Sequence, residues 1–182
     1  VNASVPVADA TVALWVDGSY QHAEFASGAG PGQGVKGDAL KGVDSAEVAF
    51  GTKVSYKGFA LVASGFKAHG VGFRTRHGEG ALDIAGKGKH TYGGYLQGTY
   101  DFGQGSNIGY SYGGNYALQT GAELGSTAVA ETNGQTLHSG MIWHNVTDNF
   151  RVIAEGGFTE HSFHMGGALE DTFGGVGAFF FW

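Results

Sequence analysis

Apolar and polar residues alternate with a period of two along most of the chain. In residues 45–56 the even positions from Ala46 to Tyr56 are almost all apolar, whereas the odd positions include Glu47 and Lys53. Neighbouring side chains of a β-strand point to opposite faces, so this pattern predicts a strand with one apolar and one polar face. Segment 59–68 is apolar on both faces, so its register stays open. The eight predicted strands are 11–22, 45–56, 59–68, 91–102, 108–116, 135–145, 150–159 and 172–182.

The connections between these strands alternate between long and short. Four of them, 23–44, 69–90, 117–134 and 160–171, are long, and they all fall at the same end of the strands. The connections at the other end are short: 57–58, 103–107 and 146–149. Compact soluble domains favour connections of about 4–6 residues. Short turns at one end and long loops at the other are typical of outer-membrane barrels.

Strand length and aromatic placement also favour a membrane barrel. The predicted strands have about the 9–11 residues that cross a bilayer, whereas strands of soluble proteins average about 5–6. Aromatic residues gather near the short turns, where they would form a girdle at the level of the lipid headgroups. The predicted girdle residues are Tyr56, Phe59, Phe102, Trp143, Phe150, Phe180 and Trp182.

The predicted fold is therefore all-β: a transmembrane antiparallel up-and-down β-barrel with eight strands in this chain. Residues 1–182 form one outer-membrane domain, in which residues 1–10 are an N-terminal periplasmic segment. The alternative is a soluble β-sandwich, which also has many alternating strands. A sandwich is less favoured because its core would have to accept several charged positions, and its long glycine-rich loops would need a separate explanation.

Composition narrows the function classes. The chain has 35 Gly, 2 Pro and 24 aromatic residues among 182, with a net charge of −6 and no Cys. This apolar and aromatic content argues against disorder. The acidic balance argues against a nucleic-acid partner, and the missing Cys excludes disulfides and thiolate metal sites.

Four stretches, 92–103, 108–113, 138–155 and 174–182, resemble strands of Gram-negative outer-membrane porins. The last one resembles the C-terminal strand by which such barrels are recognised for insertion, although its terminal residue is Trp182 where Phe is usual. Porins have about sixteen strands and roughly twice this length, so the chain is similar to the C-terminal half of one. Either it is part of a larger barrel, or it is a complete small barrel.

The resemblance implies a bacterial outer-membrane protein for passive diffusion of small hydrophilic solutes or ions, which forms a homotrimer. The alternative is a monomeric eight-stranded barrel with a filled interior, acting as an anchor, adhesion or surface-interaction protein. In both cases the apolar faces contact outer-membrane lipid.

With the apolar faces on lipid, the opposite faces would line a pore. The predicted pore-lining residues are Asp17, Gln21, Glu47, Lys53, Gln97, Asp101, His138, His144, Arg151 and Glu155. In a wide barrel they would contact water, whereas in a filled barrel they would have to pair with one another. Glycines expected on the same face would leave space and slightly favour an open lumen. These glycines are Gly51, Gly109, Gly113, Gly140, Gly157, Gly175 and Gly177.

The sequence predicts no enzyme, no metal site and no cofactor. His138 and Ser139 are neighbours in a strand, so they face opposite sides and cannot serve one site with Glu155. The groups Glu160, His161 and His164 match no metal-ligand pattern. Loop 69–90 is a candidate for a charged vestibule, and the alternative, which is favoured, is a simple solvated surface. Its candidate residues, with Lys67 before it, are Arg74, Arg76, His77, Glu79 and Asp83.

Overall fold

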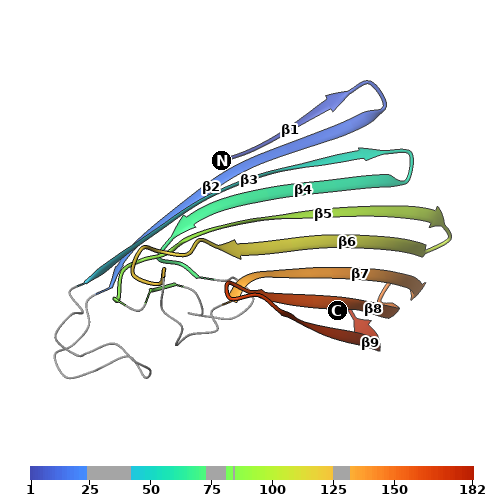
Figure 1. Ribbon diagram of the computed structural model, residues 1–182. Helices are drawn as coiled ribbons and strands as arrows, with labels where there is room; N and C mark the ends of the chain where they lie inside the picture. Colours follow the sequence, from blue (N-terminus) through green and yellow to red (C-terminus); the bar gives the residue numbers. More distant parts are fainter. Residues whose placement is uncertain (24–41, 73–80, 84, 125–131) are drawn as a thin grey trace.

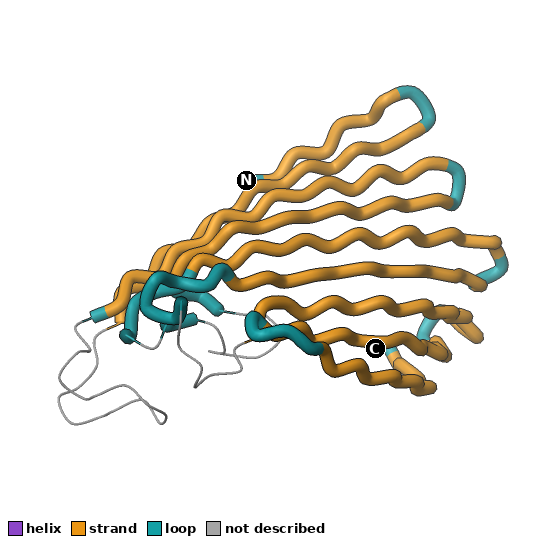
Figure 2. The backbone as a smooth tube through the Cα atoms, viewed as in Figure 1, coloured by secondary structure: helices purple, strands orange, loops and turns teal. Residues whose placement is uncertain are grey.

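The computed structural model describes residues 1–23, 42–72, 81–83, 85–124 and 132–182. These residues form one nine-stranded sheet in which every strand pairs antiparallel with the next one in sequence (Figure 1). The strands are β1 (Asn2–Val7), β2 (Ala10–Ala23), β3 (Val43–Tyr56), β4 (Phe59–His69), β5 (His90–Gly103), β6 (Ser106–Ala117), β7 (Thr132–Thr147), β8 (Phe150–Phe163) and β9 (Ala168–Phe180). In the described part of the chain, no helix is long and apolar enough to span a membrane (Figure 2).

The predicted all-β, up-and-down architecture is confirmed, with nine strands in place of eight. The additional strand is β1, which lies in the segment 1–10 that was predicted to precede the barrel. It pairs with β2 along its whole length, from Asn2 opposite Trp15 to Val7 opposite Ala10. Its six residues include Pro6, which lacks a backbone donor and is tolerated in an edge strand. The sequence pattern was too short and too interrupted to predict it.

The turns at one end of the sheet are tight. At Lys57-Gly58 the φ angles are 44° and 85°, and at Gln104-Gly105 they are 53° and 81°. Two consecutive positive φ values are the signature of the type I′ turn, whose twist matches that of a β-hairpin. The connection between β8 and β9 at the other end is also short, since it spans only 164–167. Three of the four connections at that end are therefore long.

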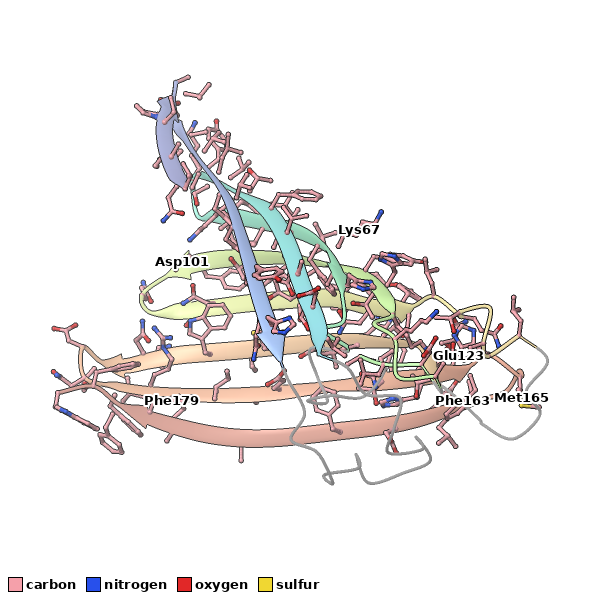
Figure 3. The ribbon with its side chains drawn as sticks, turned by 90° about the vertical axis from the view of Figure 1, so that its left-hand side faces the viewer. Lys67, Asp101, Glu123, Phe163, Met165 and Phe179 are labelled. Carbon is pink, nitrogen blue, oxygen red and sulfur yellow. The ribbon has the colours of Figure 1, made fainter. Side chains whose placement is uncertain are left out.

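The sheet is curved and open. In its strand order, β1 and β9 are the two edges, and each pairs with a single neighbour. Figure 3 shows the sheet bending round between these edges, so that β2 and β3 run steeply across the direction of β7 to β9. The described strands therefore do not close into a ring, and the alternative of a complete eight-stranded barrel is not favoured.

The pairing register gives the sheet two distinct faces. The apolar face carries Leu14, Phe50 and Leu61 together with the residues that alternate with them along each strand. The polar face carries the intervening residues. One row of paired positions crosses the polar face from β2 to β9: Trp15, Gly51, Ser64, Tyr95, Gly113, Leu137, Thr159 and Asp171.

Burial shows which face is concave. Large side chains of the apolar face are open to the surroundings, since Phe50 is 60% exposed and Leu61 is 50% exposed. The polar face holds the buried strand residues Ala49, Phe66, Ala68, Thr91, Ser111, Ala117 and Ser139. Side chains crowd together on the inside of a bend, so the polar face is the inner one. An exposed apolar surface this extensive marks a contact with lipid or protein.

Candidate functional site: the two faces of the wall

The register places eight of the ten predicted pore-lining residues together on the polar face. They are Asp17, Gln21, Glu47, Lys53, Gln97, Asp101, Arg151 and Glu155. Their role in lining a pore stays a prediction. In Figure 3, Asp101 lies at the short-turn end of the sheet, and Glu123 lies at the opposite end.

The placement of His138 and His144 on the polar face was wrong. His138 pairs with Tyr112 and Phe158, which belong to the apolar face, and its ring stacks on Phe158 with centroids 4.4 Å apart. The Tyr110 hydroxyl lies 2.7 Å from its Nδ1. His144 also faces outward, with Nδ1 2.9 Å from the Ser106 hydroxyl. An imidazole combines an apolar body with a polar tip, so these residues suit an aromatic surface with hydroxyl partners.

Gly140 was also expected among the glycines of the polar face, and this was wrong. The register places it on the apolar face, where it pairs with Tyr110 and Gly156. The other six glycines of that group lie on the polar face. Ser139 also lies on the polar face, so it and His138 do face opposite sides as predicted. The Ser139 hydroxyl donates a hydrogen bond to the carboxylate of Glu155.

Predicted girdle residues form aromatic contacts at the short-turn end of the apolar face. Ring centroids of Phe59 and Tyr100 are 4.3 Å apart, and those of Tyr100 and Phe102 are 4.9 Å apart. Phe150 and Phe180 stack at 4.6 Å. Tyr56 pairs with Phe59 and extends this row. We call these residues the turn-side aromatic row.

Two members of the predicted girdle do not belong to this row. Trp143 lies on the polar face, where it pairs with Asn107 and Ile153. Trp143 follows Ile142 directly in β7, and because Ile142 is on the apolar face, Trp143 points to the opposite face. The prediction used only the closeness of Trp143 to the turn, which does not determine the face. Trp182 lies beyond the last residue of β9.

A second aromatic row, which was not predicted from the sequence, lies toward the loop end of the apolar face, and we call it the loop-side aromatic row. Tyr92 and Tyr116 stack there with centroids 5.4 Å apart, and the remaining rings are Tyr20, Tyr112 and Phe158. Tyr92 and Phe102 are ten residues apart on β5. Ten residues span about 33 Å along a strand, or about 25 Å in height at a tilt of about 40°, which matches the apolar band of outer-membrane barrels. The tyrosines near the loop ends of the predicted strands could have indicated this second row.

The two cations of the polar face lie far apart in the described sheet. Lys53 is on β3 and Arg151 is on β8, five strands apart, which corresponds to about 24 Å along the sheet. Arg151 instead donates from Nε to Asn145 Oδ1 at 2.7 Å. Asp101 accepts a hydrogen bond from the backbone N–H of Gly103 at 2.8 Å. Within the described residues, no group of three or more His, Cys, Asp or Glu is placed to hold a metal ion.

Segments 81–83, 85–89 and 118–124 pack together at the loop end, and with His164 we call them the loop cluster. Lys89 Nζ lies 3.0 Å from Glu123 Oε1, and both side chains are almost completely buried. Asp83 accepts hydrogen bonds from the backbone N–H of Lys87 at 2.8 Å and from the Thr120 hydroxyl at 2.9 Å. Burial lowers the pKa of His164, and the nearby Lys89 ammonium lowers this pKa further.

The predicted charged vestibule is only partly described. Asp83 is 4% exposed inside the loop cluster, so it does not form an open charged surface. Lys67 lies on the apolar face, opposite Tyr92 of the loop-side aromatic row. Arg74, Arg76, His77 and Glu79 lie outside the described residues.

A hollow of about 450 Å³ lies on the polar face, in the loop-side half of the wall. We call it the inner-wall pocket. Its polar-face lining comes from β4 to β8: Ser64, Phe66, Tyr95, Gly113, Asn115, Gln135, Leu137, Thr159 and His161. Larger hollows of about 930 and 770 Å³ are lined mainly by apolar-face residues such as Leu61, Tyr110 and Ile142, on the side away from a lumen.

Comparison with known proteins finds a similar fold but no similar sequence family. No protein-family model matches the chain, and no curated protein matches it. The crystal structure of the outer membrane channel DcaP of Acinetobacter baumannii is similar, with a TM-score of 0.73 and 12% sequence identity, over 99% of this chain and 50% of that one. The described antiparallel sheet therefore has the same fold as about half of that structure.

The chain spans about half the length of this channel structure. An open sheet with two unpaired edges agrees with a match to part of a barrel wall. At 12% identity the likeness concerns the fold alone.

Proposed function

We propose that this chain forms part of the wall of an outer-membrane channel through which small hydrophilic solutes or ions diffuse passively. The observation that carries the proposal is the two-faced, curved sheet. Its apolar face is exposed and lies between two aromatic rows, whereas its concave face carries Asp17, Lys53 and Glu155. Apolar outside and polar inside is the arrangement of a water-filled membrane barrel.

The two sheet edges require further strands. Each backbone N–H or C=O left unpaired in the hydrocarbon costs several kcal/mol, so open sheet edges do not occur there. We therefore propose that β1 and β9 pair with additional strands of the same polypeptide, to close a barrel of about sixteen strands. The likeness to half of a channel structure supports this closure.

The charges on the polar face favour cations. Its described strands carry five carboxylates, against Lys53 and Arg151 as cations. Rings of carboxylates select cations in membrane pores. The five carboxylates are Asp17, Glu47, Asp101, Glu155 and Asp171.

Neither catalysis nor a cofactor enters this proposal, and the selectivity comes from lumen width and charge. The assembly proposed from the porin resemblance is a homotrimer in the bacterial outer membrane. Chemical crosslinking of the protein in native membranes checks it, and a purely monomeric pattern would contradict it.

Conductance in a planar bilayer tests the proposed function. The purified full polypeptide should give stable single-channel steps, and its mass should be near twice 18.8 kDa. Correctly folded protein that gives no steps would contradict the channel. A mass near 18.8 kDa would contradict closure by further strands of the same chain.

A further inference from the structure

We propose that the inner-wall pocket binds a neutral saccharide of one or two sugar units. This inference rests on the proposed function, because the pocket is open to solutes only if the polar face lines a lumen. It adds a substrate class and a binding site to a wall that would otherwise select only by width and charge.

The pocket is built from two adjacent rows of paired residues. The first row runs through Ser64, Tyr95, Gly113, Leu137 and Thr159. The second row, one step closer to the loop end, runs through Phe66, Gly93, Asn115, Gln135 and His161. Both rows belong to central strands of the sheet, so neighbouring strands hold these side chains in place on both sides.

Glycines create the hollow and let the rings lie against the wall. A Cβ atom on Gly93 would lie 2.5 Å from Phe66 Cε1 and 2.6 Å from Asn115 Oδ1, so these two side chains cover the glycine backbone. Gly113 is less crowded, since a Cβ there would lie 3.6 Å from Tyr95 Cδ2. The space above Gly113 is therefore bordered by a phenol ring and stays free for a ligand.

This mixture of side chains fits a sugar. The negative face of Tyr95, which is 38% exposed, attracts the weakly positive C–H groups on one side of a pyranose ring. The amide of Asn115 carries both donors and an acceptor, so it can pair with two adjacent sugar hydroxyls. Ser64 and Thr159 add hydroxyl groups.

The charge around the pocket favours a neutral ligand. Its described lining includes neither a Lys or Arg nor an Asp or Glu side chain, and its ionisable members are His161 and the Tyr95 phenol. Binding of a carboxylate or phosphate would need an Arg or Lys partner. Asp171 pairs with Thr159 at the edge of the pocket, so it repels anions and can accept a hydrogen bond from a sugar hydroxyl. A hollow of about 450 Å³ also lies within the usual size range of small-ligand sites.

Two measurements on the folded full polypeptide in detergent or a planar bilayer test the proposal. Isothermal titration with glucose and with maltose should show saturable, millimolar binding. In a bilayer, the same sugars should block the ion current over the same concentration range. Sodium benzoate, an anion with an aromatic ring, should neither bind nor block in that range.

A matched pair of variants locates the site. Gly113→Val places two methyl groups in the pocket and should weaken maltose binding by about tenfold or more. Gly175→Val is the control, because Gly175 lies on the same face of β9 and a Cβ there meets nothing within 4 Å. Should Gly113→Val fail to fold, Asn115→Leu keeps the side-chain volume, removes the amide and should weaken binding similarly.

The outcomes separate the two proposals. Channel steps without sugar binding or block would overturn the saccharide site and leave the channel standing. Sugar binding without channel steps would overturn the channel and, with it, the placement of the sugar site in the wall of a lumen. Equal weakening by Gly175→Val, or tighter binding of benzoate than of maltose, would also overturn the site.

Discussion

On β7 the alternation of faces, more than the polarity of a residue, decides where each side chain lies. His138 contacts Phe158 on the apolar face, and its neighbour Ser139 binds Glu155 on the polar face. Lys67 also lies on the apolar face, beside Tyr92 of the loop-side aromatic row. A long lysine side chain at that level can place its ammonium among the headgroups.

An arginine scan of two adjacent residues tests the assignment of the faces. Leu61 lies on the apolar face opposite Gly98, between the two aromatic rows, and Val62 lies on the polar face opposite Gln97. Leu61→Arg should destabilise the inserted protein by about 2–4 kcal/mol, because it places a cation in hydrocarbon. Val62→Arg is the control and should have a much smaller effect. Urea unfolding in lipid vesicles measures both, and the reverse order would mean that the faces are exchanged.

The Lys57-Gly58 turn gives a second residue-scale prediction. Gly58 has a φ of 85°, and a Cβ there would lie 2.9 Å from the Asp101 carbonyl oxygen. Gly58→Ala should therefore lower the free energy of unfolding by roughly 1–2 kcal/mol. Gly121→Ala, where a Cβ meets nothing within 4 Å, should cause little change in the same unfolding experiment. An equal loss in both variants would show that backbone strain in the turn is not the cause.

At the scale of elements, the sequence pattern predicted the long strands well. Strands such as β3 have a strict alternation over many residues, which determines both their existence and their faces. β4 was found as a strand, but its register came only from pairing, which puts Leu61 and Val62 on opposite sides. The six-residue β1 has too few alternating positions to stand out from a loop, and it is held by β2.

The loop cluster could not be predicted, because its contacts join residues far apart in sequence. The ion pair of Lys89 and Glu123 links two separate connections, as does the hydrogen bond of Thr120 to Asp83. The alternation of apolar and polar residues along the strands does not predict such pairs. The inner-wall pocket could be predicted only in part. Gly113 was expected on the inner face, but only the pairing register of the strands shows that Phe66, Tyr95 and Gln135 lie around it.

Removing the buried cation should open the loop cluster. Lys89→Met leaves the buried Glu123 carboxylate without the ammonium 3.0 Å away, and loss of one partner of a buried ion pair costs about 3–5 kcal/mol. Hydrogen exchange at residues 118–124 should therefore become much faster. Lys87→Met, at an exposed position of the same segment, is the control. Unchanged exchange in Lys89→Met would show that the ion pair does not hold the cluster.

Acid should loosen the same cluster through His164. Its pKa is lowered in the folded state by burial and by Lys89, with Glu123 and a hydrogen bond to the Ala117 backbone acting in the opposite direction. The unfolded state therefore binds the proton more readily, and stability falls as pH decreases below about 6.5. Amide exchange in the cluster should accelerate below that pH, and His164→Gln should remove this part of the pH dependence. The same acceleration in His164→Gln would assign the effect to another group.

At the scale of the whole molecule, the curvature separates an exposed apolar side from a concave polar side. The carboxylates of the inner face are spread over β2, β3, β5, β8 and β9. No single carboxylate accounts for the whole negative electrostatic potential of the inner face, so each single substitution should change ion selectivity by a small amount.

Asp17→Asn tests this view of the inner face. Removing one carboxylate should shift the zero-current potential in a potassium chloride gradient toward that of a less cation-selective pore, by several millivolts. Asp148→Asn alters a carboxylate in the exposed turn between β7 and β8 and should have a smaller effect. An unchanged potential in Asp17→Asn would mean that this position does not contact the conducted ions.

Since each strand pairs only with its neighbours in sequence, the sheet has no crossover connections. A gene segment that encodes one hairpin, such as β5 with β6, could be duplicated or deleted without rethreading any other part of the chain. Each such event would change the circumference by two strands and leave the direction of the remaining strands unchanged. Barrel diameter grows roughly linearly with strand number, so this topology gives evolution a direct way to adjust the bore of the proposed channel.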